Sequence, residues 1–219
     1  MMVPFVKGTK DKDGKEKIGA AALGFLLSYN GTRYVVTAKH VVEDDEELGV
    51  SLGSKVVRPS ETLAELGGQW IPHPDPEIDL AVLPIRRSLK LQTGFFLPFR
   101  FAMNSGEVNL GDDVIFGSLP YYTPIPIVLR RGMVAYTEDK GFLIDGQVFP
   151  GSSGSPVFLY KRPLRFAGIV VGYRPYEDVA ISGQTGEVRA VYSENSGIGV
   201  VHTTDKLKEL LDSKEFATQ

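Results

Sequence analysis

Residues 141–159 read GFLIDGQVFPGSSGSPVFL, two strand-like runs on either side of the turn GSSGSP at 151–156. A nucleophilic serine needs a hydroxyl exposed on a tight turn, beside backbone N–H groups that can bind an oxyanion. Glycines at 151 and 154 permit such a sharp backbone. The turn indicates a serine nucleophile, with the N–H groups of Gly151 and Ser153 directed into one small pocket. A simple hairpin loop is the alternative interpretation.

A histidine follows the strand-like run in VVTAKHVV, residues 35–42. This run comes directly after Asn30-Gly31, a strong hairpin signal. A strand that ends at His40 would let its ring reach another part of the fold. A hydrogen-bonded core histidine is the alternative interpretation.

An aspartate opens the apolar strand IDLAVLPI at 78–85. A buried carboxylate needs a partner, and a histidine N–H is a useful one. Asp79 is therefore the candidate acid. Asp75 and Glu77 are alternatives in the proline-rich loop just before it, where we expect exposed side chains.

Short apolar runs separated by turn residues dominate the rest of the chain, for example at 112–119, 125–136, 166–173 and 197–201. Regular spacing of this kind predicts an all-β barrel or sandwich. Leucines at helical spacing predict one short helix at 205–213.

The segment near 102–111 is interpreted as a join within a single domain that covers residues 1–219. The N-terminal half, 1–104, carries His40 and Asp79. The C-terminal half, 105–219, carries Ser153 and the helix.

The composition excludes several classes of function. The 219 residues carry a net charge of −3 with no basic block, so nucleic acid is not an expected partner. Cysteine is absent, which excludes thiol catalysis and disulfides. The three histidines are scattered, so we expect no metal site.

The first seventeen residues, MMVPFVKGTKDKDGKEK, contain no apolar signal-peptide core. No apolar run approaches the ~20 residues that a membrane-spanning helix needs. We therefore expect no membrane association and a cytoplasmic location, which the absence of cysteine also favours.

Together these phrases resemble the chymotrypsin/trypsin-like serine protease superfamily. VVTAKHVV is similar to its T-A-x-H phrase, IDLAVLPI to its D-[IL]-A-[VL]-L strand, and GSSGSPV to its G-x-S-G-[GS]-P-V turn. FAGIVVGY at 166–173 resembles the strand that lines the peptide cleft, and GIGVVHTTDKLKELL at 197–211 resembles the final strand and helix. The cysteine-free HtrA-like, glutamyl-endopeptidase and trypsin-like peptidase groups are the most similar.

The resemblance implies two six-stranded antiparallel β-barrels and a serine endopeptidase that acts on polypeptides through an acyl-enzyme. Ser153 would attack, His40 would act as base, and Asp79 would orient the imidazole. The resemblance also implies that no cofactor is needed. Ser152 stands where many members carry an aspartate that pairs with a new N-terminus. The oxyanion loop would then be set by its own packing, by substrate or by a regulatory protein partner.

The resemblance also implies a substrate pocket formed by Gln147, Val171, Gly172 and Tyr173, with Gln147 at its base. This set favours a small or medium apolar side chain at the cleavage position. An insert from Arg174 to Ser196, with a hairpin tip near 182–186, could select substrate or be a surface elaboration.

Two other functions remain open on the same fold. One is a catalytically silent module that binds peptides. The other is an acyl hydrolase or esterase that uses the same three residues.

Overall fold

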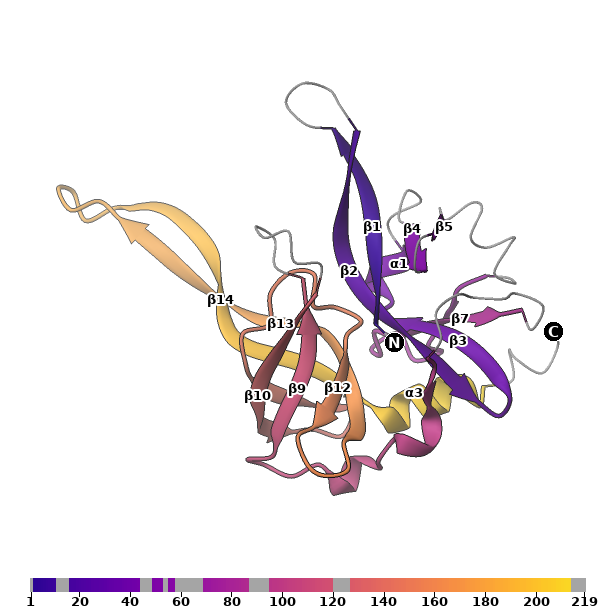
Figure 1. The fold of residues 1–219 in the computed structure, drawn as a ribbon. Helices are drawn as coiled ribbons and strands as arrows, with labels where there is room; N and C mark the ends of the chain where they lie inside the picture. The colour runs from indigo at the N-terminus through magenta and orange to yellow at the C-terminus, as the bar shows by residue number, and fades with distance from the viewer. Residues whose placement is uncertain are drawn as a thin grey trace.

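The computed structural model describes residues 2–10, 16–43, 49–52, 55–57, 69–86, 95–119 and 127–213. The described strands form two sheets that lie side by side, with a short helix packed beneath them (Figure 1). The first sheet comes from the N-terminal half of the chain and the second from the C-terminal half.

The first sheet contains eight described strands in the order β5-β4-β1-β2-β3-β7-β6, with β8 paired parallel to β2. The tight β2–β3 turn follows from Asn30 and Gly31, whose φ angles are 46° and 78°. The strands are β1 Met2–Lys10, β2 Glu16–Tyr29, β3 Thr32–Thr37, β4 Gly49–Leu52, β5 Lys55–Val57, β6 Ile71–Pro72, β7 Ala81–Ile85 and β8 Leu97–Pro98. The helical turns in this half are α1 His40–Glu43, η1 Phe99–Phe101 and η2 Ser105–Glu107.

The second sheet closes into a barrel in the order β10-β11-β14-β13-β12-β9. Its interior is filled by apolar side chains from alternate strand positions, such as Val114, Phe116 and Phe142. The strands are β9 Asp113–Ser118, β10 Val128–Thr137, β11 Gly141–Asp145, β12 Pro156–Leu159, β13 Arg165–Ile181 and β14 Val188–Thr203.

Helix α3, Thr204–Leu211, follows β14 and packs on the first sheet. Its buried Leu207, Leu210 and Leu211 belong to the same apolar core as the first sheet. The ring of Phe166 from β13 also enters that core, 5.3 Å from the ring of Phe25 in an edge-to-face contact. The two sheets are thus joined by shared core packing.

The structure confirms the all-β, chymotrypsin-like fold class and the short helix after the last strand. The first sheet has eight described strands where six were expected, because β6 and β8 add two-residue pairings. The boundary between the halves near residue 104 stays a prediction. No helix within the described ranges is long and apolar enough to cross a membrane.

Two long hairpins project from the body (Figure 1). One is formed by β1 and β2. The other continues β13 and β14 beyond the barrel and is closed at Ser182 by a hydrogen bond to Glu187 O of 2.9 Å. This second hairpin is the expected insert, and we call residues 174–196 the arm.

Candidate active site

The nucleophile turn lies between β11 and β12. Pro150 and Gly151 occupy the centre of a turn closed by a 2.9 Å hydrogen bond from Ser152 N–H to Phe149 O. The φ of Gly151 is 89°, as a type II turn requires at this position. In the part of the chain that is described, the N–H groups of Gly151 and Ser153 donate to no protein acceptor.

The close approach of two backbones explains the glycine at 154. Its φ is 82°, and a Cβ there would lie 1.8 Å from the carbonyl oxygen of Leu23. In the same contact, Leu23 N–H donates to the carbonyl oxygen of Ser153 across 2.9 Å. The turn of the second sheet is therefore docked on strand β2 of the first.

The other two serines of the turn, Ser152 and Ser155, are fully buried and hydrogen-bonded. Ser152 Oγ donates to Ser118 Oγ at 3.0 Å, and Ser155 Oγ accepts the N–H of Gly117 at 2.6 Å. Ser153 is half-buried and is the serine of the turn that contacts a histidine. The turn is held by internal hydrogen bonds where many superfamily members use an aspartate.

His40 stands at the end of β3, at the start of the single turn α1. Its Nε2 lies 3.1 Å from Ser153 Oγ, and its Nδ1 lies 2.6 Å from Asp79 Oδ2. Its backbone N–H donates to Asp79 Oδ1 at 2.8 Å. The three predicted residues therefore form one continuous hydrogen-bond chain across the two sheets.

Asp79 lies two residues before β7, between the fully buried Ile78 and Leu80. Burial alone would raise the pKa of Asp79, but the two hydrogen bonds from His40 outweigh it and hold the pKa below its usual range. Asp79 is thus a carboxylate at neutral pH and can accept from His40.

The two alternative acids lie elsewhere. Asp75 Oδ2 is 3.1 Å from Lys140 Nζ, and Glu77 also pairs with this amine. The backbone N–H of Glu77, which donates to Asp75 Oδ1 at 2.9 Å, and then Lys140 lower the pKa of Asp75. Hydrogen bonds to Glu77 and Asp75 raise the pKa of Lys140. The loop before Asp79 is therefore bound to the β10–β11 turn of the second sheet.

His202, on β14, is a site residue that the sequence did not reveal. Its Nε2 accepts the backbone N–H of Asp79 at 3.0 Å, and its Nδ1 lies 3.2 Å from Lys140 O. These contacts require the neutral tautomer with the proton on Nδ1, because Nε2 must keep a lone pair and Nδ1 must donate. Burial lowers the pKa of His202 and favours that form. The partners are 123 residues apart, and no local motif marks the contact.

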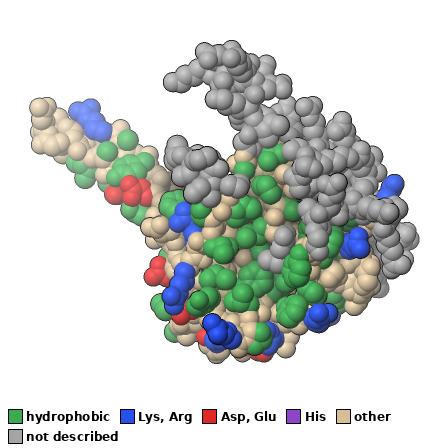
Figure 2. Space-filling view, in the orientation of Figure 1, with side chains coloured by type: hydrophobic (Ala, Val, Ile, Leu, Met, Phe, Trp, Pro, Cys, Tyr) green, Lys and Arg blue, Asp and Glu red, His purple; other side chains and the backbone are tan. Residues whose placement is uncertain are grey.

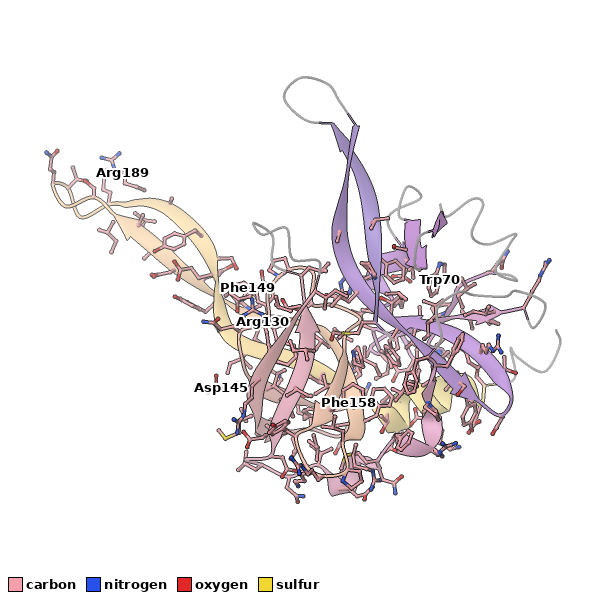
Figure 3. All side chains as sticks on the ribbon, viewed as in Figure 1. Trp70, Arg130, Asp145, Phe149, Phe158 and Arg189 are labelled. Carbon is pink, nitrogen blue, oxygen red and sulfur yellow. The ribbon has the colours of Figure 1, made fainter. Side chains whose placement is uncertain are left out.

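The residues assigned to the pocket lie around the inner part of β13 and the loop after β11. Val171 is buried, while Gly172 and Tyr173 are half-buried. Gln147 is exposed, with Oε1 3.5 Å from Arg130 Nη1. It lines a cavity of about 580 Å³ on the outside of β10. The Arg130 guanidinium also lies 4.7 Å from the ring centre of Phe149 (Figure 3).

The neighbour of Gln147 points inward instead. Val148 is 1% exposed, and its Cγ2 lies 2.4 Å from where a Cβ of Gly199 would be. Tyr173 packs against the core cluster that contains Val148. The inward-facing side chain of this loop is therefore Val148.

A chymotrypsin-like fold with serine, histidine and aspartate in hydrogen-bond contact between its two sheets defines the class of trypsin-like serine peptidases. The chain belongs to the trypsin-like peptidase domain family, which matches residues 22–164. The resemblance seen in the sequence is confirmed, including its HtrA-like character.

Curated relatives are similar over most of this chain. The probable periplasmic serine endoprotease DegP-like of Chlamydia trachomatis is 28% identical over 198 residues, which is 86% of this chain and 32% of the relative. The protein of the same description from Chlamydia pneumoniae is 27% identical over 165 residues, 72% of this chain and 29% of the relative. The chain thus spans about a third of the length of these relatives.

Proposed function

We propose that the chain is a serine endopeptidase that forms an acyl-enzyme on Ser153. The family and the relatives support serine peptidase activity. The observation that carries the finer proposal is the hydrogen-bond chain from Ser153 Oγ through His40 to Asp79, with distances of 3.1 and 2.6 Å.

The geometry supports a definite role for each residue. Ser153 Oγ attacks the substrate carbonyl carbon while His40 Nε2 takes its proton, and the protonated ring then gives a proton to the leaving amine. Asp79 accepts from Nδ1, which keeps Nε2 free as the base and stabilises the imidazolium. Water repeats these steps to release the acyl group.

The Gly151 and Ser153 N–H groups are the proposed oxyanion donors. Both lie on the turn held by Ser152 and Phe149, and neither is used elsewhere in the described structure. Hydrogen bonds of Ser152 and of the Ser153 carbonyl hold the turn, which supports the preorganisation that stabilises a transition state.

The proposed preference at the cleavage position is an uncharged side chain of small or medium size. We place Val148, rather than Gln147, at the base of the pocket with Gly199. The support is that Val148 is buried against Gly199, whereas Gln147 faces outward near Arg130. Val171, Gly172 and Tyr173 keep their proposed place along the pocket wall.

A fluorophosphonate probe combined with peptide cleavage tests the proposal. The chain should react with the probe and cleave a peptide library, and Ser153→Ala should abolish both while circular dichroism shows a folded protein. Ser152→Ala is the matched control and should remain labelled. Labelling with ester cleavage but no peptide cleavage would indicate an acyl hydrolase. The absence of labelling in the folded chain would indicate a silent peptide-binding module.

The remaining expectations stay predictions. A polypeptide is the proposed substrate, and a regulatory protein partner stays a prediction. A cytoplasmic location stays a prediction, and a periplasmic one is a property of the named relatives.

A further inference from the structure

The arm joins the second barrel at an irregular point in the pairing of β13 with β14. Between the pair Tyr173–Gly199 and the pair Pro175–Asn195, three residues of β14 lie opposite one residue of β13. Extra residues on one strand form a bulge, which bends that strand and redirects its side chains. From this bulge the arm projects away from the body of the protein (Figure 2).

The side chain of Asn195 extends from the bulge to the loop that precedes the nucleophile turn. Its Nδ2 donates to the carbonyl oxygen of Val148 at 2.6 Å, and its Oδ1 accepts the N–H of Gly197 at 2.8 Å. Because one end of the amide must donate and the other must accept, these two contacts fix its orientation. In the described structure, no second donor bonds to the Val148 carbonyl oxygen.

A backbone contact joins the same loop to the same bulge. The N–H of Gly146 donates to the carbonyl oxygen of Gly197 at 3.2 Å. The φ of Gly197 is 81°, a conformation that glycine adopts without steric cost. Residues 146–148 are therefore bound to β14 at both ends, once through a backbone bond and once through Asn195.

This loop carries two parts of the proposed site. The side chain of Val148 packs toward Gly199 at the proposed base of the pocket. The next residue is Phe149, whose carbonyl oxygen accepts the N–H of Ser152 at 2.9 Å and closes the nucleophile turn. A shift of the Val148 backbone would therefore change the pocket and disturb the turn that carries Ser153.

We propose that Asn195 is a positioning residue that sets the side-chain preference of the active site. Its amide holds the backbone of Val148, so the Val148 side chain closes the pocket at a fixed depth and large side chains are rejected. The inference rests on the proposed function and concerns the selectivity of that same site.

The test compares two peptides that differ only in valine or phenylalanine at the cleavage position. The ratio of their kcat/KM values measures selectivity, and it cancels any change that affects both peptides equally, such as the titration of His40. Asn195→Ala leaves the Val148 carbonyl oxygen without its donor and frees the loop. The ratio of valine to phenylalanine should then fall by at least about fivefold.

Ser196→Ala is the matched control in the same bulge. Ser196 Oγ donates to the carbonyl oxygen of Arg174 and accepts the N–H of Ile198 at 3.1 Å. This variant loses hydrogen bonds of the bulge but keeps the contact of Asn195 with the loop, so the ratio should stay within about twofold of that of the intact chain. Equal changes in the two variants would reflect a general loosening of the arm and would overturn the role of Asn195.

Asn195→Asp separates the donor from the shape of the side chain, and it carries the test if Asn195→Ala does not fold. The introduced carboxylate still accepts the N–H of Gly197 but cannot donate to Val148, so near neutral pH its ratio should match that of Asn195→Ala. The carbonyl oxygen of Val148 raises the pKa of the introduced carboxyl group, which can donate once it is protonated. The ratio should therefore return toward that of the intact chain as the pH falls to about 4.5. A ratio that stays constant over this range would overturn the proposal.

Peptide binding to chains that also carry Ser153→Ala tests the pocket without catalysis. By fluorescence anisotropy, Asn195→Ala should lower the preference for the valine peptide by at least about threefold. If the intact, folded chain cleaves neither peptide, the proposed function is overturned, whereas a shift in this binding preference still supports Asn195. If both peptides are cleaved and neither ratio shifts, the role of Asn195 is overturned and the proposed function stands.

Discussion

The backbone N–H of Asp79 donates a 3.0 Å hydrogen bond to Nε2 of His202, which belongs to the other sheet. Asp79 is thus held by two histidines, one at its side chain and one at its backbone. His40 binds its oxygens, and His202 holds its backbone. His202 in turn contacts the carbonyl oxygen of Lys140.

Replacing His202 tests whether this second contact matters. His202→Leu should lower kcat by about tenfold to a hundredfold with KM little changed, because a buried N–H without an acceptor costs about 1–3 kcal/mol. His202→Gln supplies an acceptor that does not titrate, and should retain kcat within about threefold.

The dependence of kcat/KM on pH tests whether His202 positions Asp79 or only stabilises the fold. The pKa of His202 is lowered mainly by burial. The ionisable groups that also act on it are Asp79, His73 and Lys140. As the pH falls through this lowered value, Nε2 gains a proton and can no longer accept. The intact chain should lose kcat/KM more steeply in acid than His202→Gln, and equal slopes would exclude the positioning role.

Neutralising the proposed acid should nearly abolish turnover. Asp79→Asn should lower kcat by about 10⁴-fold near neutral pH, because the amide favours the wrong imidazole tautomer. Asp75→Asn is the matched control, since its carboxylate contacts Lys140 and not His40. Steady-state cleavage of a fluorogenic peptide measures both variants. A comparable loss in Asp75→Asn would contradict the assignment.

Acid should destabilise the fold through its buried histidines. Burial lowers the pKa of His73, whose Nε2 has no hydrogen-bond partner in the described structure. The unfolded chain, with an ordinary pKa near ~6.5, then binds more protons than the folded chain. This contribution to stability is fully present above that pH and is lost as the pH falls to the lowered value.

Urea unfolding of the Ser153→Ala chain at several pH values measures this effect without self-cleavage. His73→Gln should make the free energy of unfolding depend less on pH between about 7 and 5. An unchanged dependence would show that His73 is not the titrating group.

A side chain at Gly154 should separate the nucleophile turn from β2. Gly154→Ala combines a positive φ with a Cβ placed 1.8 Å from Leu23 O, and should cost about 3 kcal/mol or more of stability. Gly106→Ala is the control, because nothing lies within 4 Å of its Cβ position. Thermal unfolding compares the two, and similar melting temperatures would contradict the docking contact.

Shortening the side chain at 148 should change substrate choice. Val148→Gly removes the side chain that packs against Gly199, so larger apolar residues should be accepted at the cleavage position. Gln147→Ala, one residue earlier, should leave the preference unchanged. A peptide library measures both, and the reverse result would restore Gln147 as the base of the pocket.

Local sequence phrases were sufficient to propose the triad. GSSGSP marks a turn, VVTAKHVV a strand that ends at a histidine, and IDLAVLPI a strand that begins with an acid. Each phrase depends on backbone geometry within a few residues, which sequence patterns encode well. The structure brings the three side chains together, and their catalytic roles stay predictions.

Other features of the site could not be predicted from the sequence. They depend on the direction in which a side chain faces or on contacts between residues far apart in the chain. Adjacent side chains in an extended segment point to opposite sides, so Gln147 faces out and Val148 faces in, and the residue at the base of the pocket stays a prediction. The contact of His202 joins β14 of the second sheet to Asp79, which lies just before β7 of the first, and the two residues are far apart in the sequence. The hairpin of the insert was predicted, but its alternating pattern does not mark the contact of Asn195 with Val148.

The packing of helix α3 has a consequence for how the chain folds. Leu207, Leu210 and Phe166 complete the apolar core of the first sheet, although they follow that sheet in the sequence. During synthesis, the strands that carry His40 and Asp79 emerge first but cannot finish burying their core until the chain has been made through Leu211. Contacts between such distant segments form late and slowly. The Ser153–His40 pair therefore assembles only after the segment through Leu211 has joined the core of the first sheet.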